Sequence, residues 1–276
     1  MREEDYRIHG QLGEAPTTMV VTWCDDAGGL GDNVAQQLVA QLGCEEVGEI
    51  EVVNFFALGG VSVENDVAQF PEGKFYASPQ RQIVVVKSDP PVSEWYAFLN
   101  VILDVAERHC SVKELYTIGG MVSMSAHTTP RQLLAMAGST EFKKVLSQYG
   151  ITRDMDYETP DGQRPTLNSF LLWLAKQRGI PAAGLWVPVP FYMVNGEDPK
   201  AWRKVLEFLD TRLGLGLDFS DIDEQAKSQG ERIAQALARA PDLQESVQRL
   251  ETNLMISQED SERLVAEMEK LFRQRG

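Results

Sequence analysis

A polar stretch from Gly119 to Arg131 carries the side chains of this sequence that are best suited to chemistry. It directly follows Leu115–Ile118, an apolar run that predicts a buried strand. The stretch combines hydroxyls, an imidazole and a guanidinium, supplied by Ser123, Ser125, His127, Thr128, Thr129 and Arg131. Ligands of open α/β sheets bind where strands end in loops, so this junction is the first place to expect one.

Two interpretations of this stretch stay open. In a hydrolase or phosphorylase, His127 would be the acid or base and Arg131 would anchor an anion. The third member would be one of three aspartates, Asp25, Asp26 or Asp89. Alternatively, Thr128 or Thr129 caps a helix with Pro130 in its first turn, and His127 lies at a surface or interface. We favour the second interpretation because the sequence has no nucleophile elbow and no H-E-x-x-H motif.

A glycine-rich turn, Gly28–Asn33, follows the predicted strand Thr18–Trp23. Such a turn at a helix start can bind phosphate, but Asp25, Asp26 and Asp32 would repel an anion here. We therefore interpret the glycines as a tight turn, with Asp32 at the helix N-terminus as a cap or first-turn anion. If a small ligand binds, these two segments supply its contacts: Gly29, Gly31, Asp32, Asn33, Gly119, Gly120, Ser123, Ser125, His127 and Arg131. No residue is assigned a catalytic role.

Hydrophobic periodicity predicts the elements that position these segments. Strands are expected at Thr18–Trp23, Glu49–Val53, Gln82–Lys87, Leu115–Ile118 and Ala183–Tyr192. Helices are expected from Asn33 to Gly43, Ser93 to His109, Glu141 to Gln148, Phe170 to Arg178 and Lys200 to Leu213. The segment Asn54–Arg81 reads as a loop with one or two short edge strands.

The composition changes after Gly216, which predicts an α/β core over residues 1–216 and a helical region over 217–276. Capping signals occur at Ser220-x-x-Asp223 and Ser257-x-x-Asp260. Apolar residues recur at coiled-coil spacing: Leu243, Val247, Leu250 and Leu254, then Leu264, Met268 and Leu271. This pattern predicts an antiparallel helical hairpin that turns near Asn253–Ser257 and packs on its own domain or on a neighbouring subunit.

Bulk composition excludes several classes of protein. The 276 residues are 43% hydrophobic, enough for a large core, and the net charge of −15 disfavours nucleic acid and anionic membranes as partners. We expect no signal peptide, no membrane span and a cytoplasmic location. Three cysteines and three histidines without a metal-binding spacing predict no disulfide framework, no metal site and no cofactor.

The ordered motifs resemble one family. They are Gly28–Ala35, Tyr116–Gly120, Ala126–Arg131, Gly184–Tyr192 and the helix start Pro199–Trp202. Their order and spacing are similar to those of the PAC2 family, which is named for a proteasome assembly chaperone, and the resemblance runs roughly from Thr17 to the end.

The resemblance implies a three-layer α/β/α fold with a mostly parallel or mixed sheet, similar in topology to purine nucleoside phosphorylases. It also implies homo-oligomers and, where a role is known, assembly of proteasome α-subunits, with no established enzyme activity. Some members dock through a C-terminal hydrophobic-Tyr-x tripeptide, whereas this sequence ends with Phe272–Gly276, so we do not expect that docking mode. The expected function is a non-enzymatic binding or assembly protein. The alternative is an enzyme or binder for a nucleoside-like or anionic ligand at Gly119–Arg131.

Overall fold

The computed structural model describes residues 5–10, 17–56, 62–64, 66–151, 156 and 158–273. The chain divides into two compact units. The first comprises Met1–Asp25, Val34–Ile118 and Leu134–Leu185. The second comprises Asp26–Asn33, Gly119–Leu133 and Trp186–Gly276. The predicted division at Gly216 follows composition rather than contacts, and it stays a prediction.

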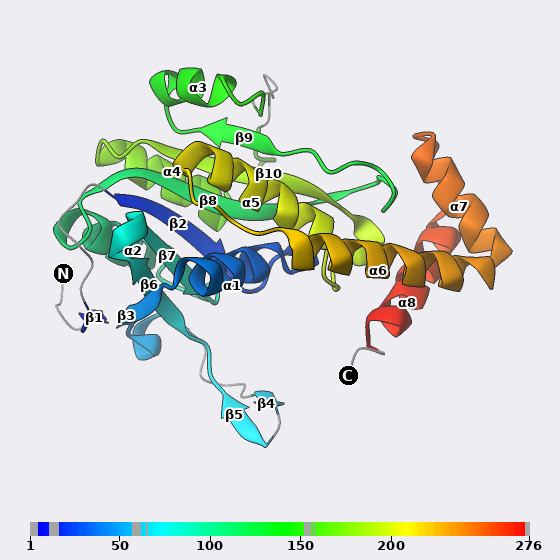
Figure 1. The fold of residues 1–276 in the computed structure, drawn as a ribbon, viewed down its shortest axis with the longest axis horizontal. Helices are drawn as coiled ribbons and strands as arrows, with labels where there is room; N and C mark the ends of the chain where they lie inside the picture. The colour runs from blue at the N-terminus through cyan, green and yellow to red at the C-terminus, as the bar shows by residue number, and fades with distance from the viewer. Residues whose placement is uncertain are drawn as a thin grey trace. The chain divides into compact units, whose positions relative to one another are not determined.

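A mixed eight-stranded sheet forms the first unit, in the order β1-β3-β6-β7-β2-β8-β10-β9 (Figure 1). Its strands are β1 (Tyr6–Ile8), β2 (Thr17–Trp23), β3 (Glu45–Ile50), β6 (Gly73–Ser78), β7 (Ile83–Ser88), β8 (Val112–Ser123), β9 (Leu134–Ala137) and β10 (Ala182–Pro190). Strand β2 pairs in parallel with β7 and β8, whereas the neighbours from β1 to β7 pair antiparallel. The chain of β8 and of β10 continues into the second unit. The predicted α/β class with a mixed sheet is confirmed.

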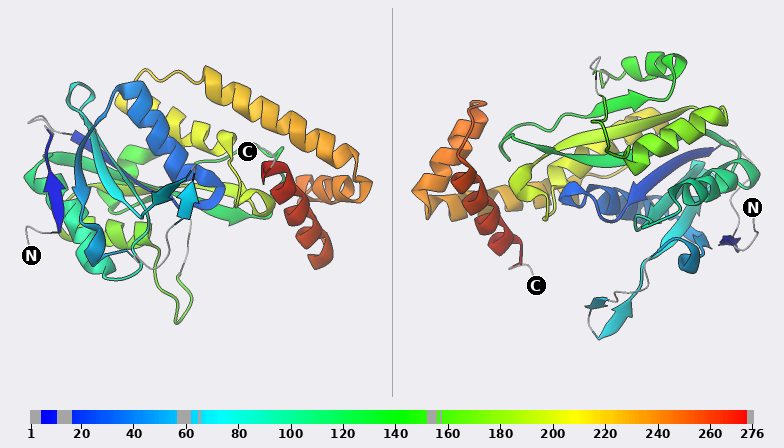
Figure 2. Two further views of the ribbon diagram at one scale, coloured as in Figure 1. Left: turned by 90° about the horizontal axis from the view of Figure 1, so that it is seen from below. Right: turned by 180° about the vertical axis from the view of Figure 1, so that it is seen from behind.

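Helices cover both faces of this sheet. They are α1 (Leu30–Leu42), α2 (Trp95–Arg108) and α4 (Leu167–Gln177), with α3 (Thr140–Ser147) following β9. All seven residues of β2 are buried, and Met19 and Val21 join the core that includes residues of α2 and α4. Alternation along a strand turns Val20 to the opposite face. Figure 2 (left) shows the sheet between α1 on one side and α2 and α4 on the other.

Two predicted elements of the first unit need correction. The strand expected at Glu49–Val53 is β3, which ends at Ile50, and a short 3-10 turn occupies Val52–Asn54. The segment expected to be a loop with one or two short edge strands contains three strands, β4 (Ser62–Glu64), β5 (Val67–Gln69) and β6, among its described residues, since residues 57–61 and 65 lie outside the described part. Strand β6 is interior, between β3 and β7, since Phe75 and Ala77 are buried on it. The strand was missed because only Phe75 and Ala77 mark its buried face, and it begins with Gly73 and ends with Ser78.

Four helices dominate the second unit: α5 (Pro199–Leu213), α6 (Ser220–Ala238), α7 (Pro241–Glu251) and α8 (Gln258–Arg273). The predicted hairpin is α7 and α8, and α6 packs on both. Five predicted seam residues are buried: Leu243, Val247, Leu250, Leu264 and Met268. Leu254, also expected in the seam, is exposed because α7 ends at Glu251.

The starts of α6 and α8 test the two predicted capping signals, and only one of the two is present. Ser257 Oγ accepts the backbone N–H of Asp260 (3.0 Å), which is the N-cap bond of a capping box, and the same hydroxyl donates to the Asp260 carboxylate (2.6 Å). Ser220, by contrast, is the first helical residue of α6, and the preceding Phe219 provides no side-chain cap. The second signal is confirmed and the first was wrong.

Candidate functional site

The glycine turn is held by backbone hydrogen bonds within the second unit. Gly28 and Gly29 adopt positive φ (71° and 59°), a conformation that favours glycine. The Gly28 N–H donates to the Val194 carbonyl (3.0 Å), and the Gly28 carbonyl accepts the N–H of Asp198 (2.9 Å) and the indole N–H of Trp202 (3.2 Å). The polar groups of Gly28 therefore bind protein, as expected for a tight packed turn. Helix α1 begins at Leu30, which places Asp32 in its first turn.

The side chains of Asp26 and Asn33 form hydrogen bonds with the backbone at the two ends of the turn. The Asp26 carboxylate accepts the N–H of Ala27 (2.9 Å) and that of Gly120 (2.8 Å to Oδ2 and 3.0 Å to Oδ1). The Asn33 amide donates to the Gly29 carbonyl (2.8 Å). Asp26 thus joins the two glycine motifs of the family resemblance, Gly28–Asn33 and Gly119–Gly120.

The predicted polar loop begins later than expected. Strand β8 continues through Gly119 and Gly120 to Ser123 instead of ending at Ile118. A Cβ atom on Gly120 would lie 2.5 Å from the Ala27 carbonyl oxygen, so only glycine lets the strand pass there. After β8, the Ser123 and Ser125 hydroxyls bind each other at 3.1 Å.

The helix cap expected at Thr128 or Thr129 was wrong. Residues 124–133 contain no helix, and the Thr129 N–H donates to the Ala126 carbonyl (3.1 Å) in a turn. The Thr128 hydroxyl donates instead to the Glu251 carboxylate at the end of α7 (2.5 Å). A Thr-Pro pair is also compatible with a turn, which is the outcome here.

His127 is buried against Tyr192 of the 3-10 turn Phe191–Met193. Its backbone N–H donates to the Tyr192 hydroxyl oxygen (2.6 Å), and that hydroxyl lies 3.0 Å from His127 Nδ1. Lys200 donates to the His127 carbonyl (3.1 Å). Burial, reinforced by the charges of Lys200 and Arg131, lowers the pKa of His127 to about 4. The imidazole is therefore neutral at pH 7, with Nδ1 placed to accept the Tyr192 hydroxyl proton.

Arg131 forms a buried ion pair with Asp198, the residue before α5. Its Nε lies 2.7 Å from Asp198 Oδ2, and the two side chains are 3% and 0% exposed. Nη1 donates to the Thr129 carbonyl (2.7 Å), and Nη2 faces the Met193 sulfur at 3.9 Å. Asp198 also accepts the N–H of Ala201 and so caps α5. The guanidinium already binds Asp198, Thr129 and Met193, so it is poorly placed to bind an anion from solution.

The structure brings His127 and Arg131 into one buried cluster with Tyr192, Asp198 and Lys200. Asp26 contacts Gly120 rather than this cluster, and two other expected acids, Asp25 and Asp89, belong to the first unit.

The sequence patterns missed Asp198 and placed Tyr192 only at the end of the predicted strand Ala183–Tyr192. The pair Asp198-Pro199 is itself a helix-start signal that could have identified the aspartate.

Metal and thiol chemistry find little support in the described ranges. There, no three side chains among His, Cys, Asp and Glu are arranged to hold a metal ion. Among the described residues, Cys24, Cys44 and Cys110 form no disulfide, and burial raises the pKa of Cys44 to about 11 and that of Cys110 to about 12. No helix in this part of the chain is long and apolar enough to cross a bilayer.

Solved structures with the same fold include several described as proteasome-related. Mycobacterium tuberculosis Rv2714, of unknown function, is 20% identical, with a TM-score of 0.75 over 92% of this chain and 89% of its own. The M. tuberculosis proteasome-assembly chaperone homologue Rv2125 is 21% identical, with a TM-score of 0.69 over 84% and 100%. Pyrococcus furiosus PbaB, an archaeal proteasome activator, is 19% identical, with a TM-score of 0.68 over 84% and 98%.

Sequence comparison identifies a family rather than a close relative. Among curated proteins, none matches this sequence significantly. The family model of the PAC2 family matches residues 21–237, well over half of the 276 residues, and it includes both glycine motifs and the His127 and Arg131 cluster. The chain belongs to the PAC2 family.

Proposed function

We propose that this protein is a non-enzymatic binding or assembly factor whose partner is another protein. One observation carries the proposal: along Gly119–Leu133 the ionisable side chains are buried, whereas several apolar side chains are exposed to solvent. The charged or ionisable His127 and Arg131 are buried and paired, whereas Met121, Val122 and Met124 are 40%, 61% and 46% exposed. Exposed contiguous apolar side chains are typical of protein interaction sites, and methionine adapts to varied partner shapes.

The buried cluster supports this exposed segment rather than a reaction. Asp26 fixes Gly120 immediately before Met121, and the contacts of His127 with Tyr192 and of Arg131 with Asp198 fix the chain after Met124. A segment held at both ends loses less conformational freedom when it binds a partner. In this proposal the residues predicted to contact a small ligand shape a protein-binding surface.

Proteasome components are the class of partner that the relatives favour. Rv2125 is described as a proteasome-assembly chaperone homologue and PbaB as a proteasome activator, and both share this fold. By this likeness, the proposal extends to binding of proteasome α-type subunits, in the cytoplasm, by a homo-oligomer of this chain.

Native mass spectrometry with purified α-type proteasome subunits tests the proposal. We expect a complex of defined stoichiometry with the wild-type protein and at least a tenfold weaker one with the triple variant Met121→Ser, Val122→Thr, Met124→Ser. The matched control is Leu254→Ser with Met255→Ser, which changes exposed apolar residues elsewhere in the second unit and should bind normally. Equal binding by the triple variant would remove this surface from the proposal. Failure to bind α-subunits or any other assembling protein captured from native extract would reject the function.

A further inference from the structure

A small β-hairpin in the first unit leaves an apolar face uncovered. Strands β4 and β5 form their own two-stranded sheet, projecting from the eight-stranded sheet (Figure 1). Val63 pairs with Ala68, so these two side chains lie on one face of the hairpin, and Phe70 directly follows the end of β5. Val63 and Phe70 are 67% and 58% exposed. A lone two-stranded hairpin is at best marginally stable in water, so this one would gain from a further strand.

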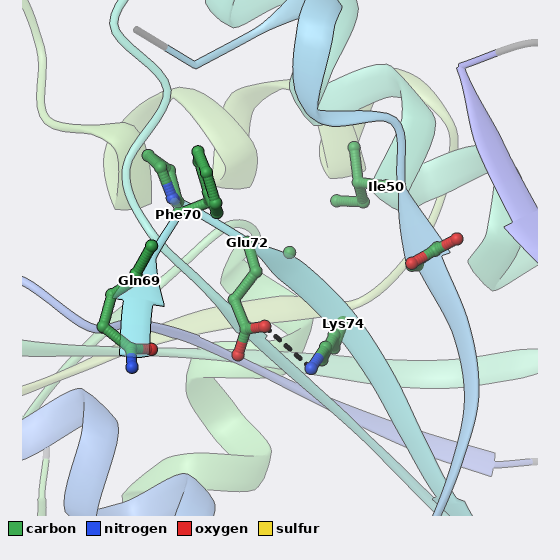
Figure 3. Close-up of a pocket in the computed structure, with 9 residues that line it drawn as sticks. Ile50, Gln69, Phe70, Glu72 and Lys74 are labelled. Carbon is green, nitrogen blue, oxygen red and sulfur yellow. Dashed lines mark ion pairs between the residues drawn. The ribbon is translucent and has the colours of Figure 1, made fainter. Parts of the chain in front are cut away.

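A pocket of about 340 Å³ lies at the base of the hairpin (Figure 3). Its walls combine apolar and charged side chains, among them Glu49, Ile50, Gln69, Phe70, Glu72 and Lys74. Figure 3 shows Glu72 reaching toward Lys74, and their ion pair measures 2.7 Å. The exposed Phe70 ring thus lines the same hollow as the carboxylates.

The pocket and the charged side chains next to it are acidic even after their ion pairs are counted. Lys74 pairs with Glu72 and lies 3.6 Å from Glu46. Arg7 lies 2.9 Å from Glu51 and 3.7 Å from Glu49. The charged residues that line the pocket are Glu49, Glu72 and Lys74, which carry a net charge of −1. With the neighbouring Glu46, Glu51 and Arg7, four carboxylates stand against two cations, a charge of −2 that attracts a cation.

We propose that the hairpin and its pocket bind an extended, basic segment of a partner protein in which apolar residues alternate with arginine. The apolar side chains would cover Val63 and Ala68, while one guanidinium would stack on Phe70 and pair with Glu72. Main-chain hydrogen bonds to one edge of the hairpin would add the missing third strand. A second copy of this chain would bring the same acidic side chains and would be repelled, so the charge favours a different, basic protein.

This inference gives a surface and a partner chemistry to the proposed binding function and rests on it. It concerns the first unit, whereas the Met121–Met124 surface belongs to the second. The two can therefore fail separately. Loss of α-subunit binding in the Met121–Met124 triple variant together with normal binding in hairpin variants would support the function and reject this surface.

Fluorescence anisotropy with labelled synthetic peptides tests the surface directly. The probe is an extended peptide of alternating valine and arginine, compared with versions in which lysine or glutamate replaces arginine. We expect the arginine peptide to bind about threefold more tightly than the lysine peptide, from the guanidinium stacking on Phe70, and the glutamate peptide to show no binding. Phe70→Ala and Glu72→Gln should each weaken binding by about threefold and together by about tenfold.

Controls separate this surface from general attraction to an acidic protein. Tyr96→Ala removes another exposed aromatic ring of the first unit and should leave peptide affinity unchanged. Thermal unfolding of each variant should stay close to that of the wild type, because Phe70 is 58% exposed and the Glu72 side chain, 48% exposed, forms only a surface ion pair. Equal affinity of the arginine peptide for the wild type and for the Phe70→Ala, Glu72→Gln double variant would overturn the proposal. Equal binding of the glutamate peptide would overturn it as well.

Discussion

Among single residues, Arg131 and Asp198 form an ion pair whose burial determines how much its loss lowers the free energy of unfolding. Both side chains are almost fully removed from water, so the loss of one charge leaves the other without solvent or a counter-charge. We expect Asp198→Asn, which can still cap α5, to lower the free energy of unfolding by about 3 kcal/mol. Urea denaturation followed by circular dichroism measures this change.

The matched control is a second arginine–aspartate pair in the same unit. Arg203 and Asp223 lie 2.6 Å apart, but their side chains are 33% and 54% exposed. Asp223→Asn should therefore cost less than 1 kcal/mol. Similar losses in the two variants would contradict a structural role for the buried pair.

His127 gives the fold a defined dependence on pH. Its pKa is about 4 in the folded protein and about 6.5 in the unfolded chain, so the unfolded chain binds the proton more readily. The contribution of His127 to the free energy of unfolding should be complete above about pH 6.5. It should decrease as the pH falls from about 6.5 to about 4, and change little below pH 4. The loss attributable to His127 should reach about 3 kcal/mol.

His127→Gln should abolish this contribution, so the difference in unfolding free energy between wild type and variant should shrink or change sign between pH 7 and pH 4. Denaturant titrations at four or five pH values measure it. His109→Gln, which changes an exposed histidine, serves as the control and should preserve the wild-type slope. A wild-type slope in His127→Gln would mean that other groups cause the dependence.

Among the elements, β8 depends on a close backbone approach at Gly120. An added Cβ would meet the Ala27 carbonyl oxygen at 2.5 Å, and the strand would have to move away from Asp26. We expect Gly120→Ala to lower the free energy of unfolding by about 2 kcal/mol. The opposite is expected for Gly230→Ala inside α6, where the added Cβ would meet no atom within 4 Å beyond its chain neighbours and the backbone of its own helix, and alanine favours the helix by about 1 kcal/mol. Thermal denaturation of both variants checks the pair, and a stabilised Gly120→Ala would show that the close approach is relaxed in solution.

Elements with strong periodicity could be predicted from the sequence, and those with weak periodicity could not. Strand β2 is wholly apolar or β-branched, and the buried Phe98, Ile102 and Val105 mark one face of α2. Strand β9 was missed because Leu-Ala-Met-Ala favours a helix as much as a strand. The extension of β8 was missed because glycine is rare inside strands, and here it serves a close approach that only the tertiary fold creates.

In the candidate site, too, the sequence predicted local groupings of side chains but not their contacts with distant residues. The sequence grouped His127 with Arg131 because they share one segment, and the structure does place both in one cluster. Their partners Tyr192, Asp198 and Lys200 come from a segment some sixty to seventy residues later. No local pattern links such distant positions, so the burial of His127, which the favoured interpretation of the sequence placed at a surface or interface, could not be predicted.

For the whole molecule, net charge and exposed apolar surface act in opposite directions on association. A charge of −15 makes copies of this chain repel one another, whereas exposed apolar side chains such as Val122 and Phe70 favour contact. Salt screens the repulsion and leaves the apolar contribution largely intact. Self-association should therefore strengthen with salt, whereas binding of a basic partner should weaken.

Light scattering coupled to size exclusion distinguishes these two responses. We expect a solution mass that is a multiple of 30.8 kDa, with the oligomer resisting dilution better at 0.5 M than at about 0.05 M salt, since the Debye length falls severalfold over that range. Affinity for the arginine peptide measured in the same buffers should fall, because attraction between opposite charges is what salt screens. A mass near 31 kDa at both salt concentrations would contradict the homo-oligomer. An oligomer that dissociates as salt rises would mean that ion pairs, rather than apolar side chains, hold the copies together.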